Sequence, residues 1–334
     1  MKIAFFEIKG WEKEILKRAF KKDKPLFFSE PLSEENLSKI KDFETVSVFI
    51  GSKINKSIIS RLKKLKLIVT RSTGFDHIEI KECKKRKIAV FNIQSYGENT
   101  VAEHTFALIL ALSRNVHKSY LRNLNHDYSI EGLKGFDLKG KTLGVIGAGS
   151  IGKHVIRIAR GFEMNVLVYD HHVDEFLAEQ LDFSYVPLDK LLEKSDIITL
   201  HIPYSKENHH LIGDKTIKKM KKGAILINTS RGGIVDTESL IKALNSKQLS
   251  GTGLDVLEGE ELIKEEKQLL YDEKNLKSLQ QLVEDHILLS KDNVVFTPHI
   301  AFYSQEALER IVHETINIIQ NFLQNKSDTK GKVC

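Results

Sequence analysis

Short apolar runs alternate with amphipathic segments along the chain, in one series before residue 100 and a second after residue 140. The runs of the first series are 2–8, 25–28, 46–50, 66–70 and 88–92, and those of the second are 143–147, 165–170, 196–201, 224–229, 251–255 and 293–297. Apolar strands that alternate with helical segments predict parallel β-α-β units. Because the runs are almost continuously apolar, we expect helices to cover each sheet on both faces.

Two longer helical patterns stand outside this alternation. Residues 101–123 are strongly apolar in their first half and predict a buried helix that links the two series. Residues 304–323 have helical periodicity and no strand after them, so they either close the second unit or return to the first. The predicted fold class is α/β, with two doubly wound parallel-sheet domains.

The composition narrows the possible partners. The chain has 334 residues and a formal net charge of +6, but its basic residues are scattered and form no nucleic-acid-binding motif. No apolar stretch reaches the roughly 20 residues that a membrane helix needs, and Glu7 interrupts the first run too early for a signal peptide. Neither Cys83 nor Cys334 has metal-site spacing. We therefore expect a cytoplasmic protein with no nucleic-acid partner, no membrane association and no metal site.

A glycine motif opens the second series. Gly147, Gly149 and Gly152 follow an apolar run and begin an amphipathic helical pattern. In this context the first glycine permits a tight turn, the second lets the backbone approach a phosphate, and the third lets the helix pack on the strand. The motif predicts a Rossmann-like dinucleotide site, and the alternative is a glycine turn used for packing alone.

The residues around the motif indicate which dinucleotide it holds. The backbone N–H groups near Ser150 and Ile151 are expected to face the pyrophosphate at a helix N-terminus. Asp170 ends the next strand, 18 residues after Gly152. Its carboxylate can accept hydrogen bonds from the ribose hydroxyls and would repel a 2′-phosphate, so the sequence predicts NAD.

Three polar residues follow later runs of the second series. Arg231, Glu260 and His299 come after the runs that end at residues 229, 255 and 297. Together they suit hydride transfer at a 2-oxo or 2-hydroxy acid, because an arginine fork grips a carboxylate and a histidine beside a carboxylate exchanges a proton. Each also has a simpler interpretation, as a surface ion pair, a solvated acidic residue or a structural histidine.

Several segments resemble those of the D-isomer-specific 2-hydroxyacid dehydrogenases. They are GVIGAGSIG, LHIPYSKENHHLI, LINTSRGGIVD, GLDVLEGE and TPHIAFYS, and RSTGFDHI and NIQSYGENTVAEHTFALILAL are similar to the family as well. The resemblance implies a substrate domain of residues 1–98 plus 302–334 and an NAD-binding Rossmann domain of residues 99–301. It also implies an active site in the cleft between two Rossmann- or flavodoxin-like domains, and a homodimer formed through the NAD-binding domain.

The resemblance assigns a role to each site residue. It implies that Arg231, Glu260 and His299 are catalytic and that Asp255 binds the nicotinamide amide. Further cofactor contacts are implied at Ile202, Pro203, Asn208, Thr229, Ser230 and Arg231, beside those at Gly147, Gly149, Ser150, Ile151, Gly152 and Asp170. Substrate contacts are implied at Thr73, Gly74, Tyr96, Phe302 and Tyr303, although the aromatic residues could instead belong to the core.

The function that follows is NAD-dependent reduction of a small-molecule 2-oxo acid, with pyruvate and D-lactate as the expected pair. The alternatives are a bulkier acid, hydroxypyruvate or glyoxylate as substrate, or a non-catalytic NAD-sensing protein on the same fold. One position departs from the family, since Glu261 stands where many members carry proline. Because Glu258 and Glu261 are close to Glu260 in the sequence, either could be the carboxylate that pairs with the catalytic histidine instead. The charged segment 261–292 is expected to be a surface insertion.

Overall fold

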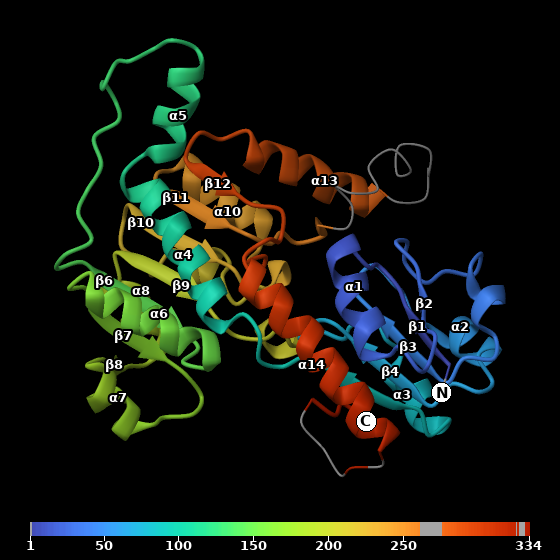
Figure 1. The fold of residues 1–334 in the computed structure, drawn as a ribbon. Coiled ribbons are helices and arrows are strands. Elements are labelled where there is room, and N and C mark those ends of the chain that lie inside the picture. Colours follow the sequence, from blue (N-terminus) through green and yellow to red (C-terminus); the bar gives the residue numbers. More distant parts are fainter. Residues whose placement is uncertain (1, 261–275, 325, 327–330) are drawn as a thin grey trace. The chain divides into compact units, whose positions relative to one another are not determined.

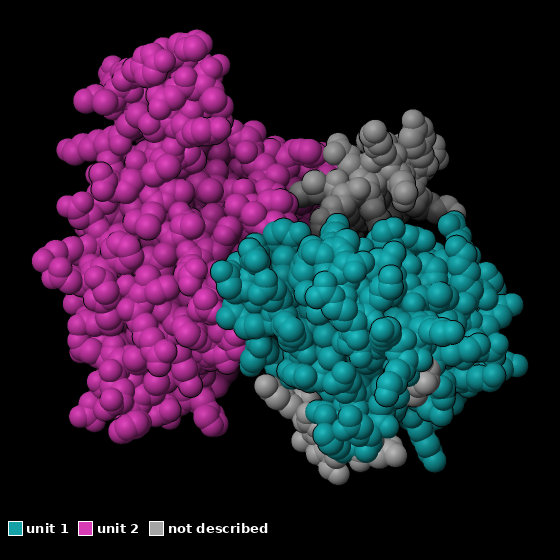
Figure 2. Space-filling model, viewed as in Figure 1, with its two compact units in different colours: residues 1–97, 303–334 teal, residues 98–302 magenta. Residues whose placement is uncertain are grey.

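The structure is a computed structural model that describes residues 2–260, 276–324, 326 and 331–334. It divides into two compact units, which have different colours in Figure 2. Unit 1 consists of Met1–Gly97 and Tyr303–Cys334, and unit 2 consists of Glu98–Phe302. The chain therefore leaves unit 1, forms all of unit 2, and returns to unit 1 for its last residues.

Unit 1 is built on a five-stranded sheet in the order β2-β1-β3-β4-β5, and its strands pair in parallel (Figure 1). The strands are β1 (Ile3–Phe5), β2 (Leu26–Phe27), β3 (Thr45–Val48), β4 (Leu67–Thr70) and β5 (Ala89–Asn92). The helices are α1 (Gly10–Ala19), α2 (Lys56–Arg61), α3 (Ile80–Lys85) and α14 (Gln305–Leu323), with a 3-10 turn η1 (Leu37–Ile40). Parallel strands need crossover connections, and α1, η1, α2 and α3 lie on these connections, whereas α14 comes after the last strand.

The C-terminal segment belongs to unit 1. Helix α14 packs against α1 and β4. Beyond it, the N–H of Val90 in β5 donates to the carbonyl of Cys334 at 3.1 Å, and Lys332 forms an antiparallel bridge with Phe91. Of the two positions that the sequence left open for residues 304–323, the structure has the return to the first unit.

Unit 2 contains a seven-stranded parallel sheet in the order β12-β11-β10-β9-β6-β7-β8. The strands are β6 (Thr142–Ile146), β7 (Asn165–Tyr169), β8 (Ser184–Tyr185), β9 (Ile197–Leu200), β10 (Ala224–Asn228), β11 (Leu249–Leu254) and β12 (Val294–Phe296). The helices are α4 (Glu98–Ser113), α5 (Val116–Leu124), α6 (Ser150–Gly161), α7 (Glu175–Leu181), α8 (Leu188–Lys194), α9 (Asp214–Ile217), α10 (Thr237–Asn245) and α13 (Leu276–Leu289), with 3-10 turns η2 (Lys206–Asn208) and η3 (Gly232–Ile234).

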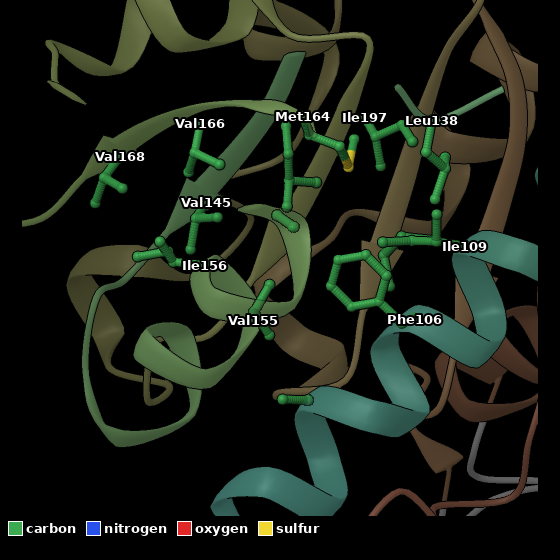
Figure 3. Close-up of a cluster of buried hydrophobic side chains, with 14 of the residues drawn as sticks. Phe106, Ile109, Leu138, Val145, Val155, Ile156, Met164, Val166, Val168 and Ile197 are labelled. Atoms are coloured by element: carbon green, nitrogen blue, oxygen red, sulfur yellow. The ribbon is translucent and has the colours of Figure 1, made fainter. Parts of the chain in front are cut away.

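Both faces of this sheet are buried, as the continuous apolar runs predict. Successive residues of a strand point to opposite faces. In β10, Ile225 and Ile227 belong to one apolar cluster, whereas Ala224 and Leu226 belong to the other. Figure 3 shows the first cluster, in which Phe106 of α4 packs with side chains of α6 and the sheet. Two parallel-sheet α/β domains are thus confirmed.

The predicted linking helix, residues 101–123, is wrong as a single element. Helix α4 ends at Ser113, and α5 begins at Val116. Asn115 between them has a left-handed backbone with φ of 51°, a conformation that asparagine tolerates better than most residues and that stops a right-handed helix. Helix α4 is largely buried, but α5 has no buried residue.

Within the described ranges, no helix is both long and apolar enough to cross a membrane. Residues 261–275, which include Glu261 and the first part of the charged segment 261–292, lie outside the described residues. The later part of that segment forms α13, which packs against α10 and β12.

Candidate active site

The candidate residues of unit 2 follow the carboxyl ends of neighbouring strands. Arg231 follows β10, Glu260 follows β11 and His299 follows β12, and these three strands are adjacent in the sheet. Strand β6 lies between β7 and β9 in the sheet. From β6 the chain adds β7 and β8 on one side and then β9 to β12 on the other, so the strand order reverses at β6. Ligands of open parallel sheets bind beyond the carboxyl ends of the strands where the order reverses.

The glycine loop after β6 has the shape that a pyrophosphate requires. Gly147 has a φ of +99°, and a Cβ there would lie 2.6 Å from the carbonyl oxygen of His201. A Cβ at Gly152 would lie 2.0 Å from the carbonyl oxygen of Gly147, so α6 packs directly on the loop. Gly149, in contrast, faces open space. The N–H groups of Ser150 and Ile151 begin α6, where helix geometry leaves them without intrahelical partners.

His299 and Glu260 are in direct contact. His299 Nδ1 lies 2.8 Å from Glu260 Oε1, and each side chain is 27% exposed. A carboxylate only accepts, so Nδ1 carries a proton and donates it to Glu260. The other ring nitrogen, Nε2, is then the atom that can exchange a proton with a ligand.

Asp255 holds the backbone that carries His299. Its side chain is almost fully buried, at 1% exposed. Oδ1 accepts the N–H of Ile300 and Oδ2 accepts the N–H of Ala301, both at 2.9 Å. The carbonyl of Asp255 also accepts the N–H of His299 at 2.9 Å. The segment from His299 to Ala301 is therefore fixed by one buried residue of β11's loop.

Two further side chains orient Asp255. Thr297 Oγ1 lies 2.5 Å from Asp255 Oδ1, and His104 Nε2 lies 2.9 Å from Thr297 Oγ1. Because the single hydroxyl proton of Thr297 goes to the carboxylate, His104 must donate to the hydroxyl oxygen. Burial lowers the pKa of His104, although the charge of Asp255 opposes the shift. His104 is thus a neutral donor at neutral pH.

Hydrogen bonds fix the backbone of Arg231, while most of its guanidinium donors have no described partner. The buried side chain of Asn228 donates to the carbonyl of Arg231 at 2.9 Å and accepts the N–H of Ser230 at 3.0 Å. Arg231 Nη1 donates to the carbonyl of Ser230 at 2.8 Å. Among the described residues Arg231 makes no ion pair, so the surface ion pair considered for it is not what the structure contains.

The two described glutamates near residue 260 have different partners. Glu260 contacts His299, whereas Glu258 Oε1 lies 2.8 Å from Nε2 of His210. Burial lowers the pKa of another histidine, His201, to about 3, so that residue cannot supply a proton at neutral pH. His299 therefore combines a partner carboxylate, Glu260, with a position after the carboxyl end of β12.

The family comparison agrees with this geometry. Residues 106–301 match the model for "D-isomer specific 2-hydroxyacid dehydrogenase, NAD binding domain". The chain belongs to the D-isomer-specific 2-hydroxyacid dehydrogenase family. Unit 2 contains the matched residues, so this dehydrogenase binds NAD through unit 2.

Relatives resemble the dehydrogenase over nearly its whole length. The "D-lactate dehydrogenase" of Escherichia coli is 32% identical, with 100% of this chain and 98% of the relative covered. The "D-specific alpha-keto acid dehydrogenase" of Enterococcus faecium is 40% identical, with 87% of each covered. The crystal structure of the D-lactate dehydrogenase from Aquifex aeolicus, complexed with NAD and lactic acid, has a TM-score of 0.85 and 38% identity and covers 97% of this chain and 96% of its own.

Asp170, which the sequence predicts to accept the ribose hydroxyls, also supports the glycine loop. Its Oδ2 accepts the N–H of Ala148 in the glycine loop at 2.7 Å, and its Oδ1 accepts the N–H of His172 at 2.9 Å. The side chain is part exposed, which leaves the carboxylate accessible to ribose hydroxyls. The negative charge at this position fits NAD, which lacks the 2′-phosphate.

The other predicted cofactor contacts lie on the loops after β9 and β10. Asn208 closes the first loop, because its amide donates to the carbonyl of Pro203 at 2.6 Å. Ile202 begins that loop and is half-buried. In the second loop, the hydroxyl of Thr229 lies 3.1 Å from that of Thr105, and the hydroxyl of Ser230 donates to Asn228 at 2.8 Å.

The predicted substrate contacts are divided between the units. Thr73 and Gly74 follow the carboxyl end of β4 in unit 1, where Asn92 donates to the carbonyl of Thr73 at 2.6 Å. Among the described hydrogen bonds, none is donated by the N–H of Thr73 or Gly74. Tyr96 is half-buried in unit 1, and Tyr303 is 57% exposed. Phe302 is the last residue of unit 2 and is half-buried.

Sequence reasoning missed Asn228, Thr297 and His104. Asparagine two residues before Ser230 is a turn signal that could have identified the first. Thr297 lies two residues before His299, but the sequence does not show that its hydroxyl donates to Asp255. His104 is 193 residues away from Thr297 along the chain, so no local pattern connects them.

Proposed function

We propose that this dehydrogenase reduces pyruvate to D-lactate with NADH, and that His299, Glu260 and Arg231 carry the reaction. The single observation that carries the proposal is the 2.8 Å contact between His299 Nδ1 and Glu260 Oε1 beyond the sheet edge. It leaves Nε2 of the imidazole for the substrate. The balanced reaction is a 2-oxo acid with NADH and a proton, which gives the 2-hydroxy acid and NAD⁺.

NADH, when bound, supplies the hydride that the carbonyl carbon accepts. As the carbonyl oxygen gains negative charge, the imidazolium of His299 donates its Nε2 proton to that oxygen. The carboxylate of Glu260 stabilises the imidazolium before the transfer and holds the ring in one orientation. In the reverse direction, neutral His299 accepts the hydroxyl proton.

Arg231 orients the substrate through its carboxylate. The guanidinium offers parallel donors that match the two carboxylate oxygens, and its backbone is fixed by Asn228. We assign the N–H groups of Thr73 and Gly74 to the same carboxylate. Asp255 Oδ2 accepts one described hydrogen bond, from Ala301, and therefore keeps a lone pair for the nicotinamide amide.

The choice of pyruvate rests on relatives. The structure from Aquifex aeolicus was determined with NAD and lactic acid, and the relative from Escherichia coli is named D-lactate dehydrogenase. The name of the Enterococcus faecium relative, "D-specific alpha-keto acid dehydrogenase", supports a second candidate. In that case the substrate is either a bulkier 2-oxo acid or one of two others, hydroxypyruvate and glyoxylate. His299, Glu260 and Arg231 keep the roles described above.

Oxidation of NADH with a series of 2-oxo acids tests the proposal. The series is pyruvate, glyoxylate, hydroxypyruvate and a branched 2-oxo acid, each measured as kcat/KM. We expect pyruvate to have the highest value, and D-lactate but not L-lactate to support the reverse reaction. A higher value for another acid would favour the second candidate, and turnover with none of them would refute both.

A further inference from the structure

A cluster of two histidines and a glutamate lies outside the residues that the proposed reaction uses. His209 and His210 follow η2, and Glu258 follows β11. One ligand atom from each lies within 4.8 Å of those of the other two. We propose that His209, His210 and Glu258 bind a late first-row transition-metal dication, with Zn²⁺ as the best match. Two imidazoles and one carboxylate are ligands that such ions prefer.

The hydrogen bonds of His209 prepare it as a ligand. Its Nδ1 lies 3.1 Å from the carbonyl oxygen of Gly233. A carbonyl only accepts, so Nδ1 carries the proton and the lone pair of Nε2 is available. A metal-bound histidine usually donates its other N–H to a backbone carbonyl or a carboxylate in this way.

His210 is flanked by carboxylates at both ring nitrogens. Nδ1 lies 3.9 Å from Asp236 Oδ1, and Nε2 lies 2.8 Å from Glu258 Oε1. When a metal takes the lone pair of Nε2 in place of the contact with Glu258, the single ring proton of neutral His210 lies on Nδ1, on the side of Asp236.

The distances require two adjustments of the side chains. On a tetrahedral zinc ion with bonds of 2.0–2.1 Å, neighbouring ligand atoms are roughly 3.3 Å apart. The contact between His210 and Glu258, now 2.8 Å, must open by about half an ångström. The ring of His209 stacks on that of His210 at 3.8 Å and must turn out of the stack. His209 is exposed, so this rotation disturbs no buried packing.

The surroundings favour a cation. The described ion pairs of Asp236 and Glu258 are both with His210, so neither carboxylate is neutralised by a described lysine or arginine. Asp285 of α13 is fully buried nearby, and its Oδ2 has no hydrogen-bond partner among the described residues. The charge of Glu258 contributes to raising the pKa of Asp285, so the two carboxyl groups repel each other when both are ionised. A dication would reduce the repulsion among these groups.

The proposed site would join the segment that carries His209 and His210 to the loop that carries Glu258, both in unit 2. A Cβ at Gly232 would lie 2.0 Å from the backbone carbonyl of Leu257, so the loops after β10 and β11 are in backbone contact. The segment with His209 and His210 packs on the same region, since the N–H of His210 donates to the carbonyl of Gly233 at 3.0 Å. Metal binding adds a link between this segment and the loop of Glu258, independently of the proposed reaction.

Titration of the full-length, chelator-treated protein with zinc chloride and with Co²⁺ tests the site. We expect one Zn²⁺ per chain by calorimetry and visible Co²⁺ bands of nitrogen and oxygen ligation. His209→Gln and Glu258→Gln should each weaken binding at least 10-fold, which is about 1.4 kcal/mol. His313→Gln, at an exposed histidine of α14, is the matched control and should bind as the parent does.

Three results would overturn the proposal. They are no binding by the parent, unchanged affinity in both His209→Gln and Glu258→Gln, or a thiolate charge-transfer band that indicates Cys83 or Cys334 as the ligand. Circular dichroism of the variants verifies that they are folded, and His209→Gln changes only an exposed side chain. The inference departs from the sequence-based expectation of no metal site, which considered the cysteines and gave no weight to adjacent histidines far from Glu258.

Discussion

His299, the residue proposed to exchange the proton, has an uncommon backbone conformation. Its φ is 55°, in the left-handed region, which costs a non-glycine residue roughly 1–2 kcal/mol. The cost is balanced by Asp255, whose carbonyl accepts the N–H of His299 and whose carboxylate accepts the next two N–H groups. The imidazole is therefore oriented by a buried carboxylate as well as by Glu260.

The first prediction concerns the charge of Glu260. Glu260→Gln keeps a hydrogen-bond acceptor but stabilises the imidazolium of His299 less. Reduction needs the imidazolium and oxidation needs neutral imidazole. The alkaline limb of kcat/KM for pyruvate reduction and the acid limb for D-lactate oxidation should therefore both move to lower pH. His299→Ala should lose roughly 10²–10⁴-fold in both directions.

Paired pH–rate profiles of the parent and Glu260→Gln provide the measurement. Unmoved limbs in both directions would remove Glu260 from this role. A shift with Glu258→Gln instead would assign the role to the carboxylate that contacts His210.

A second prediction concerns the fork of Arg231. Arg231→Lys keeps the charge but cannot hold a carboxylate with two parallel hydrogen bonds. We expect kcat/KM for pyruvate to fall roughly 10- to 100-fold, the equivalent of one charge-assisted hydrogen bond, with little change in the Kd of NADH. Steady-state kinetics and fluorescence titration of NADH measure the two quantities. Turnover near that of the parent would contradict the assignment.

At the scale of elements, α13 carries a buried acid. Asp285 is fully buried, and Gln281 donates to its Oδ1 at 3.2 Å. Burial raises the pKa of Asp285 to about 7, and the charge of Glu258 adds to the shift. The folded protein therefore holds a proton that the unfolded chain releases near pH 4, where an ordinary aspartate titrates. The associated stability is complete below about pH 4 and is lost as the pH rises to about 7.

Asp285→Asn should remove this pH dependence. We expect the melting temperature of the parent to fall between pH 5 and pH 8, and that of the variant to fall less. At pH 8 the variant should be the more stable of the two, by an amount on the order of 2–3 kcal/mol. Parallel slopes for parent and variant across this range would show that Asp285 does not titrate as described.

The elements also separate what sequence patterns can predict from what they cannot. Among the described residues, the apolar runs located eleven of the twelve strands, because buried parallel strands are continuous in sequence. They missed β8, a two-residue edge strand, Ser184–Tyr185, with little apolar character. They also missed the break at Asn115, because apolar periodicity does not register a single left-handed residue. The contact of Glu260 with His299 was a reasoned choice among three glutamates, and only coordinates distinguish Glu260 from Glu258.

At the scale of the whole molecule, α5 and the loop after it present an exposed apolar surface. Figure 1 shows this segment projecting from the remainder of unit 2. Its exposed apolar side chains are Val116, Tyr120, Leu121, Leu124, Tyr128 and Ile130. Several large apolar side chains exposed along one projecting segment indicate an interaction site. We propose that it contacts a second copy of the chain in a homodimer formed through unit 2.

Light scattering at micromolar concentration tests the dimer. We expect a dimer for the parent and a monomer for the double variant Leu121→Glu/Tyr128→Glu. Phe176→Glu changes an equally exposed aromatic residue of α7, 72% exposed, and should remain dimeric. A monomeric parent would refute the proposal, and a dimeric double variant would place the interface elsewhere.

The division of unit 1 between the two ends of the chain has a consequence for biosynthesis. Its sheet emerges from the ribosome first, but α14 and the strand-like contact of Val90 with Cys334 are translated last. Helix α14 buries Ile311, Val312, Ile318 and Ile319. During synthesis of unit 2, residues 1–97 therefore lack the side chains of α14 that complete their core. A chain that is truncated after Phe302 and released should resist protease across residues 98–260 and be cleaved within residues 1–97. Equal protection of both regions would mean that the first unit acquires its fold without its C-terminal segment, Tyr303–Cys334.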